Sequence, residues 1–439
     1  MSEGMSGDRN ADDGSHYDVV VCGAGAGGLA SARALGGLGL RVLVVDKQRV
    51  QRPVAKGEVL QPGALRVLRE WGTEKLLEER AGERLGRLVV RDPSGGPLMS
   101  LDYGQLPPDD RWLLAHDHLE ILDALAAGLG PGVEVRRGVL VEEPLRDASG
   151  RVTGVRLAEG GRRYDVRASL TVAADGISSR LRRAVGIDAK RVDYPHRLLS
   201  FELSGVTPRP DDFSAYLSDR GLRLVYPLPG DRVRLYVQAG PDELRGVDRA
   251  ELAGWCERML AEVPALEPLT GPLLGALDSR QLLPVSRFLS PTLSVPGLAF
   301  VGEAAYAVHP MAAQGMNTAI TSAASLAGRL ADRLDGARGM SDVDASVDAA
   351  LRDYQEERQP ILAQAARTSD NAARMVTDLS WRGRVLGRRA VRHTGANPRL
   401  LHTVTYNMSG LGPRPMSFLD RLHQIGLLPD PRAQRVPNA

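Results

Sequence analysis

The spacing of apolar residues near the N-terminus changes from strand-like to helix-like and back. The run YDVVVC at 17–22 is apolar and β-branched, glycines follow it, and an Ala/Leu pattern with helical spacing covers residues 29–38. A second apolar run, RVLVVD, covers residues 41–46. A strand, a helix and a strand in this order predict a βαβ unit and therefore a parallel sheet.

Later segments extend this pattern. Amphipathic helices are predicted over residues 63–80 and 116–129, with a β-hairpin that has a Ser-Gly-Gly turn between them. Residues 133–174 and 197–240 have the period near two that is typical of strands. The last third is helical, and we expect its long pattern to be interrupted at Pro360.

These patterns predict an α/β fold: a Rossmann-like domain, an inserted antiparallel β-sheet domain and a helical C-terminal region. The Rossmann-like domain is assigned residues 17–85, 112–190 and 276–335. The inserted sheet domain is assigned residues 86–111 and 191–275, and the helical region is assigned residues 336–439. Residues 1–16 are polar, Gly-rich and acidic, which favours a disordered tail over a signal peptide.

Composition narrows the possible function classes. The chain has 439 residues, 25% of them charged, and a net charge of +2, which indicates no electrostatic preference for nucleic acid. Its only cysteines, Cys22 and Cys256, lack metal-ligand or redox spacing and favour a reducing cytoplasm. No apolar run reaches the roughly 20 residues that a membrane-spanning helix needs. We therefore expect a cytoplasmic protein without a metal site.

The glycine-rich stretch GAGAGG at 23–28 follows a strand and opens a helix. Gly23 permits a tight turn, Gly25 lets the backbone approach a pyrophosphate, and Gly28 lets the helix pack against the strand. Asp46, at the end of the next strand, can accept hydrogen bonds from a ribose 2′-OH. These features predict a bound dinucleotide; the alternative is a Rossmann unit that has lost its ligand.

Two more strand-to-helix corners carry unusual residues. ADGISSRLRR at 174–183 places Asp-Gly after a strand, which by itself fits a simple helix cap equally well. GEAAYAVHPMAAQGMN at 302–317 combines an acid, a His-Pro and a Gln-Gly before an Ala-rich helix. Its amides around Gly315 to Asn317 can form a second anion-accepting corner. Glu303 is either a carboxylate that binds polyol hydroxyls or a partly exposed cap of the loop.

Taken together, the three motifs resemble those of the FAD-dependent aromatic hydroxylases, the para-hydroxybenzoate hydroxylase-like flavoprotein monooxygenases. The resemblance covers roughly residues 17–365 and includes the later run YQEERQP. The third motif is matched at Gly302, Ala304, Ala305, Pro310, Gly315 and Asn317. The His-Pro and Gln-Gly around Pro310 are most similar to the branch that hydroxylates ubiquinone precursors.

The chain departs from the family pattern at four positions. Glu303 stands where the family has the Asp that holds the ribityl chain, Tyr306 replaces a His, and Ala313 replaces a Gly. Near the second helix, His116 stands where relatives often have Arg. These differences affect the expected pose of the flavin more than the binding of FAD.

The resemblance implies FAD as the cofactor and NADPH or NADH as a transient reductant. It also implies a monooxygenase that uses O2, through a C4a-hydroperoxyflavin, to hydroxylate an aromatic or quinonoid small molecule, with secondary metabolism as one context. The implied cofactor-binding residues are Gly23, Gly25, Gly27, Gly28, Asp46, Lys47, His116, Asp175, Gly302, Glu303, Gly315, Met316 and Asn317. The candidate catalytic residues are Pro310, His309, Tyr226 and Arg223.

Several alternatives stay open at the level of sequence. The same fold serves FAD-dependent reductases or dehydrogenases of isoprenoid or polyene substrates, and a non-catalytic nucleotide-binding protein is a third reading. Arg234, Tyr236 and Gln238 share one strand face, and the sequence does not tell whether it looks at the flavin or at solvent. The basic stretch 382–399 fits a solvated helix face better than a peripheral membrane contact. The substrate's identity and the oligomeric state are not indicated.

Overall fold

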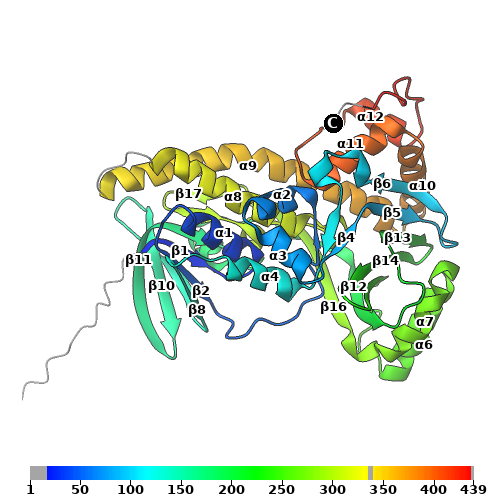
Figure 1. The fold of residues 1–439 in the computed structure, drawn as a ribbon, viewed down its shortest axis with the longest axis horizontal. Helices are drawn as coiled ribbons and strands as arrows, with labels where there is room; N and C mark the ends of the chain where they lie inside the picture. The colour runs from blue at the N-terminus through cyan, green and yellow to red at the C-terminus, as the bar shows by residue number, and fades with distance from the viewer. Residues whose placement is uncertain (1–16, 335–339, 437–439) are drawn as a thin grey trace, which may run out of the picture.

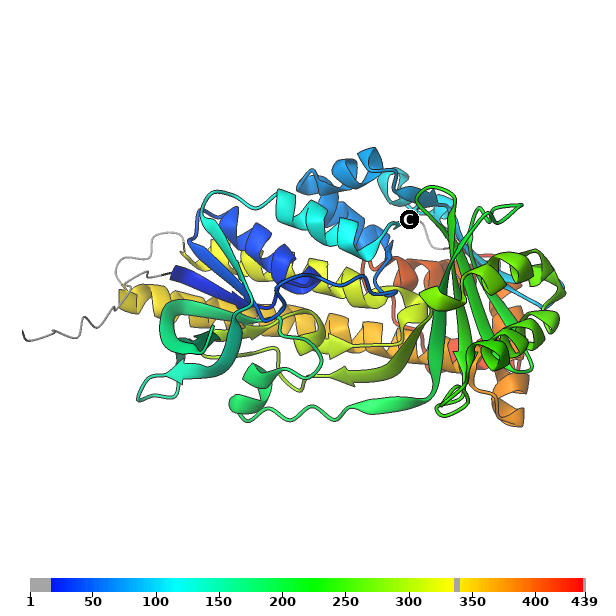
Figure 2. The same ribbon diagram turned by 90° about the horizontal axis from the view of Figure 1, so that it is seen from below.

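The computed structural model describes residues 17–334 and 340–436 (Figure 1). The predicted tail over residues 1–16 lies outside the described residues. Two large sheets lie at opposite ends of the molecule, with helices beside and between them (Figure 2). The predicted fold class is confirmed, with a largely parallel sheet, a second and mainly antiparallel sheet, and a helical C-terminal region.

The first sheet is built around the predicted βαβ unit. β1 (Tyr17–Cys22) pairs in parallel with β2 (Val42–Asp46), and α1 (Ala26–Gly36) connects them. The strand order is β17-β18-β11-β1-β2-β8, and β9 and β10 extend β11 as an antiparallel ribbon. The remaining strands are β8 (Val133–Arg137), β9 (Leu140–Arg146), β10 (Val152–Glu159), β11 (Arg162–Ala173), β17 (Ser294–Val295) and β18 (Leu298–Phe300).

Three short helices follow the first unit: α2 (Pro62–Glu70), α3 (Thr73–Glu79) and α4 (His118–Ala127). The helix predicted over residues 63–80 is thus two helices, because Gly72 between them adopts a left-handed φ of +71° that an α-helix does not allow. A small sheet of β3 (Val59–Leu60), β4 (Glu83–Leu85) and β7 (Leu113–Ala115) joins this region to the second sheet.

The second sheet has the order β19-β16-β12-β15-β14-β13-β5-β6. Its strands are β5 (Arg87–Arg91), β6 (Pro97–Asp102), β12 (Val192–Ser204), β13 (Phe213–Ser218), β14 (Gly221–Leu228), β15 (Arg232–Ala239), β16 (Gln281–Leu289) and β19 (Tyr306–Ala307). One face packs against α6 (Arg249–Ala261) and α7 (Thr270–Gly275), which bury Val225 and Leu235. The other face buries Leu224 and Tyr226 in a core that also contains Met311.

The domain division stays a prediction, but residues 276–335 contribute to both sheets. β18 pairs with β11 in the first sheet, whereas β16 pairs with β12 in the second. The segment that the sequence assigned wholly to the first domain therefore links the two sheets.

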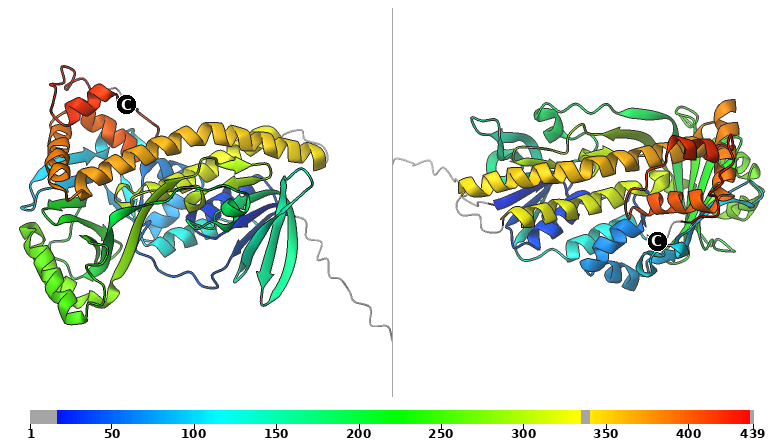
Figure 3. Two further views of the ribbon diagram at one scale, coloured as in Figure 1. Left: turned by 180° about the vertical axis from the view of Figure 1, so that it is seen from behind. Right: turned by 90° about the horizontal axis from the view of Figure 1, so that it is seen from above.

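Two long helices run side by side along the molecule, and the second ends near the C-terminal helices (Figure 3). They are α8 (Gln314–Leu334) and α9 (Met340–Thr377). The expected interruption at Pro360 is wrong, because α9 continues through it. Contacts of the two residues directly before the proline hold the helix in place: Arg358 donates to the Thr321 hydroxyl (2.9 Å) and Gln359 to the Ser290 carbonyl (3.0 Å).

The C-terminal region continues with α10 (Trp381–Gly395), α11 (Pro398–Ser409) and α12 (Phe418–Gln424). The basic stretch 382–399 forms most of α10, and part of its charge is paired, since Arg388 contacts Asp219 at 2.7 Å. Among the helices of the described residues, none combines the length and the apolar character needed to cross a membrane.

Candidate active site

The glycine-rich turn between β1 and α1 has close contacts that require glycine. A Cβ on Gly28 would lie 1.8 Å from the Gly23 carbonyl oxygen, and one on Gly23 (φ +115°) would lie 2.3 Å from the Ala174 carbonyl oxygen. A Cβ on Gly25 would meet no atom of the described residues within 4 Å. Gly25 therefore leaves an open approach to the backbone, as a pyrophosphate beside the helix N-terminus needs.

Asp46 closes this corner from the end of β2. Its Oδ2 accepts a hydrogen bond from the Ala24 N–H and its Oδ1 one from the Gln48 N–H, both at 2.7 Å. These bonds hold the carboxylate at the glycine-rich turn, where the sequence predicts a ribose. Lys47, the next predicted contact, is exposed.

The three motifs meet at one place although they are far apart in the sequence. The first and second touch where Gly23 approaches Ala174. The first and third touch where a Cβ on Gly27 would lie 3.2 Å from the Gly302 Cα. The second and third are joined by Arg182, whose guanidinium donates to the Ala304 carbonyl at 2.6 Å. One continuous site is therefore built from all three strand-to-helix corners.

Two buried side-chain acceptors at this site have no partner among the described residues. Asp175 uses Oδ2 to accept the Arg180 N–H at 2.7 Å, but its Oδ1 accepts no hydrogen bond there. The Oδ1 of Asn317 also accepts no hydrogen bond from the described residues. Buried acceptors without partners are costly, so a ligand that carries donor groups would satisfy them.

The segment before α8 is a tight turn held at several points. The 3-10 turn η6 (Pro310–Ala312) begins after His309, whose Nδ1 accepts the Met311 N–H at 3.2 Å. Gln61 donates to the Ala312 carbonyl at 3.1 Å. Ala313 then adopts φ +49°, so it keeps the backbone shape of the family's glycine at a strain of about 1 kcal/mol.

α8 follows this turn directly, so Gly315, Met316 and Asn317 lie in its first turn. The first N–H groups of a helix have no intrahelical partner and carry the positive end of the helix dipole. A Cβ on Gly315 would meet no atom of the described residues within 4 Å. This end of the helix can therefore receive negative charge, as the sequence predicts.

His309 is fully buried and forms a pair with His196 of β12, with 3.0 Å between the two Nε2 atoms. Because Met311 donates to the Nδ1 of His309, its Nε2 carries the proton and donates to His196. Burial lowers the pKa of His309 to about 3, with a further contribution from His196, and burial lowers the pKa of His196 to about 4. Both rings are thus uncharged at neutral pH.

The loop of residues 55–58 lies between the third motif, at Glu303, and the second sheet. Lys56 Nζ contacts Glu303 Oε1 at 2.9 Å, and both side chains are about half exposed. The carbonyl of Gly57 lies 3.3 Å from the Nδ1 of His118. The loop therefore borders the site that the third motif forms.

His116 does not take the position that the resemblance implies. Its Nε2 is bonded to the Arg80 carbonyl and its Nδ1 accepts the Asp117 N–H, so neither ring nitrogen is left for a cofactor. The main chain explains this orientation, because β7 ends at Ala115 and α4 begins only at His118. His118, not His116, lies next to Gly57 and the Lys56–Glu303 pair.

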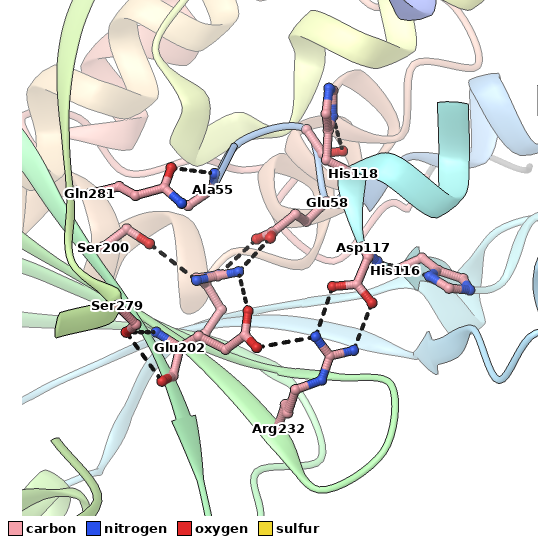
Figure 4. Close-up of polar contacts among 12 residues, drawn as sticks. Ala55, Glu58, His116, Asp117, His118, Ser200, Glu202, Arg232, Ser279 and Gln281 are labelled. Atoms are coloured by element: carbon pink, nitrogen blue, oxygen red, sulfur yellow. Dashed lines mark hydrogen bonds and ion pairs between the residues drawn. The ribbon is translucent and has the colours of Figure 1, made fainter. Parts of the chain in front are cut away.

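The second sheet turns its polar face toward this loop (Figure 4). Arg234 binds the Glu58 carboxylate with two hydrogen bonds of 2.6 and 2.9 Å. The Tyr226 hydroxyl donates to Glu58 (2.8 Å), and the Tyr236 hydroxyl donates to the Ala55 carbonyl (2.7 Å). The face whose direction the sequence left open therefore looks toward the loop of residues 55–58 and not toward solvent.

Arg223 lies on the opposite face and is not brought to the site. It is fully buried and donates to the carbonyls of Gly221 (3.0 Å) and Met259 (3.1 Å), and Glu262 lies at 3.4 Å. Burial lowers its pKa to about 10. The strand period explains this, because an odd-numbered residue of β14 must point away from Tyr226. The prediction that Arg223 lies beside the substrate is therefore wrong.

Comparison with known proteins agrees with this geometry. A family model described as "FAD binding domain" matches residues 16–369, which is most of the chain. The chain belongs to the FAD-binding domain family. This flavoprotein is 26% identical to squalene epoxidase 3 of Arabidopsis thaliana, with 72% of the chain covered, and it spans only 60% of that relative's length. It is 29% identical to 6-methylpretetramide 4-monooxygenase of Streptomyces rimosus, with 71% of the chain and 74% of the relative covered.

A solved structure supports the same assignment. PqsL of Pseudomonas aeruginosa, described as a probable FAD-dependent monooxygenase, superimposes with a TM-score of 0.71 at 26% identity. The superposition covers 83% of this chain and 97% of PqsL. The predicted resemblance to FAD-dependent aromatic hydroxylases is thus confirmed at the level of the family.

The residues present fit FAD. The open Gly25 backbone and the anchored Asp46 suit the pyrophosphate and the adenosine ribose, and the partnerless oxygens of Asp175 and Asn317 suit donor groups of the cofactor. The first turn of α8, with Gly315, suits the part of the flavin ring that carries negative charge. When bound, FAD would supply the redox chemistry.

Sequence reasoning missed three residues that border the site. Glu58, Lys56 and His196 belong to no motif of the chain, and each is identified only by its partner: Arg234, Glu303 and His309. One signal was available for Glu58, since an acid directly before the apolar pair of β3 is unusual in a buried strand.

Proposed function

We propose that this protein is an FAD-dependent monooxygenase that uses NADPH or NADH and O2 to hydroxylate an aromatic or quinonoid small molecule. The observation that carries the proposal is the junction of the three motifs, beside which the first turn of α8 lies against the loop of residues 55–58 and the polar face of the second sheet faces the same loop. Two relatives support the reaction class: one is named 6-methylpretetramide 4-monooxygenase, and PqsL has been solved in complex with 2-aminobenzoylacetate. The cytoplasmic location predicted from the sequence is part of this proposal.

Each group of residues has a distinct task. The amides at Gly315 and Met316 would hold the cofactor at the N-terminus of α8 and would favour negative charge there. The turn at Pro310, held by His309 and Gln61, keeps the peptide groups beside the ring in a fixed orientation. The Met311 and Ala312 side chains and the apolar residues of the same sheet face, such as Leu224, exclude water. The Tyr226 hydroxyl donates its proton to Glu58, so its oxygen is left to accept a hydrogen bond from a substrate hydroxyl.

A substrate screen with the purified holoprotein tests this function. Accelerated oxidation of NADPH or NADH should accompany substrate addition and consume O2, with peroxide measured separately to count uncoupled turnover. Protein that retains no FAD, even after FAD is added, would refute the proposal. Equal turnover without O2 would assign the reductase alternative instead.

A further inference from the structure

Arg234 would be the natural partner for an acidic substrate, but it already has carboxylate partners. It projects from β15 toward the loop of residues 55–58 and binds both oxygens of Glu58. The same guanidinium contacts Glu202 Oε2 at 3.0 Å. The side chains of Arg234 and Glu58 are only 5% and 3% exposed, so solvent does not compete for either. A bidentate pair of this geometry satisfies the guanidinium fork.

The pair belongs to a longer chain of charges between the two sheets (Figure 4). Arg232, two residues before Arg234 on the same strand face, contacts Asp117 at 2.6 Å and Glu202 at 3.2 Å. The chain thus contains three carboxylates, on Glu58, Glu202 and Asp117, and two guanidinium groups. The net charge of this chain of side chains is −1. A further carboxylate would therefore be repelled and not attracted.

The remaining lining of this face is apolar or uncharged. Leu198, Leu222, Leu224, Met311, Ala312 and Met408 form one buried cluster with Tyr226 and Tyr236. His196 and His309, which lie beside Met311, are neutral because burial lowers the pKa of both. Apolar side chains with two phenol hydroxyls favour a ligand of low polarity that makes few hydrogen bonds.

We propose that the site accepts an uncharged, largely apolar substrate and that Glu58 is the specificity-determining residue that rejects aromatic acids. Glu58 does this by occupying the fork of Arg234 that a substrate carboxylate would otherwise use. This inference rests on the proposed function, since it places the substrate between the flavin and the second sheet.

The test compares benzoate with its uncharged isostere benzamide, bound to FAD-loaded protein and followed by calorimetry and by the flavin absorbance. Wild-type protein should bind benzamide at least tenfold more tightly than benzoate. Glu58→Gln, which frees Arg234 and removes one negative charge, should strengthen benzoate binding at least tenfold. Asp219→Asn removes a carboxylate from an exposed ion pair with Arg388 and should leave the preference unchanged.

Two outcomes would overturn the inference: wild-type protein that binds benzoate as tightly as benzamide, or folded, FAD-loaded Glu58→Gln that gains no benzoate affinity. If Glu58→Gln does not fold, Glu58→Asp replaces it, because the shorter carboxylate releases one arm of Arg234 and should give a smaller gain. The double variant Glu58→Gln/Arg234→Gln should show no gain. Loss of FAD or of NAD(P)H oxidation in the wild type would instead refute the proposed function, so the two failures are distinguishable.

Discussion

The buried pair of His196 and His309 should make the protein sensitive to mild acid. Folded pKa values of about 4 and about 3 lie below the value of about 6.5 for an unfolded histidine. A group whose folded pKa is lowered stabilises the fold fully above the unfolded pKa, and this stabilisation is lost as the pH falls toward the folded pKa. The window of loss therefore runs from about pH 6.5 down to about pH 4 for His196 and to about pH 3 for His309.

The size of the effect follows from the same values. At pH 5, an unfolded histidine is protonated with a driving force of about 1.5 pH units, or about 2 kcal/mol, while the folded pair stays neutral. The two residues together therefore lower the free energy of unfolding by at most about 4 kcal/mol between pH 7.5 and pH 5. Since folded domains are stable by only about 5–15 kcal/mol, this loss should be easily measured.

Urea unfolding at pH 7.5 and pH 5 measures this loss in the wild type and in His196→Gln. The glutamine keeps an oxygen acceptor for the His309 Nε2–H but cannot titrate, so the variant should lose about 2 kcal/mol less than the wild type. Other neighbours of the pair are Tyr194, in ring contact with both histidines, and Asp370, which accepts the Tyr194 hydroxyl; their contributions cancel in the difference. His393→Gln, at an exposed position on α10, is the control. The same pH dependence in the wild type and in His196→Gln would refute the reasoning.

Three further predictions concern single positions. Gly25→Ala should leave the stability of the apoprotein unchanged and weaken FAD binding at least tenfold. Gly28→Ala should instead lower the stability by about 3 kcal/mol, because its Cβ has no room. Thermal melting measures the effect on stability, and FAD titration measures the effect on binding. Ala313→Gly should raise the free energy of unfolding by about 1 kcal/mol, since it removes a left-handed alanine; no gain would mean that Ala313 is unstrained. Arg223→Met should lower stability by about 1–3 kcal/mol and leave kcat/KM of the folded enzyme unchanged; a fall in kcat/KM at full stability would return Arg223 to the substrate site.

The motifs were predictable because each depends on local backbone demands that leave a trace in the sequence. Gly23 needs a positive φ and a close approach to Ala174, and both demands exclude other residues. The period of β14 and β15 likewise told which side chains share a face. That periodicity does not give the direction of the face, because both faces of this sheet are covered and buried.

The features that were not predictable depend on contacts between distant segments. Pro360 follows the general rule for a helix break, and the bonds of Arg358 to α8 and of Gln359 to Ser290, directly after β16, override it. His116 matched a family position, but its neighbour Arg80 binds the ring. Glu58 became a site residue only because β15, far along the chain, supplies Arg234. Local propensity carries no information about such partners.

The loop of residues 55–58 gives the molecule a physical link between its two binding events. Lys56 reaches Glu303 at the cofactor corner, and two residues later Glu58 reaches Arg234 on the substrate face. Between them Gly57 has φ +65°, a conformation that favours glycine, and a Cβ there would lie 2.7 Å from the Met316 side chain. Because so few residues join both contacts, any movement of Lys56 on cofactor binding would have to be absorbed by Gly57 or passed on to Glu58. Cofactor loading and the choice of substrate are therefore expected to be coupled through this loop.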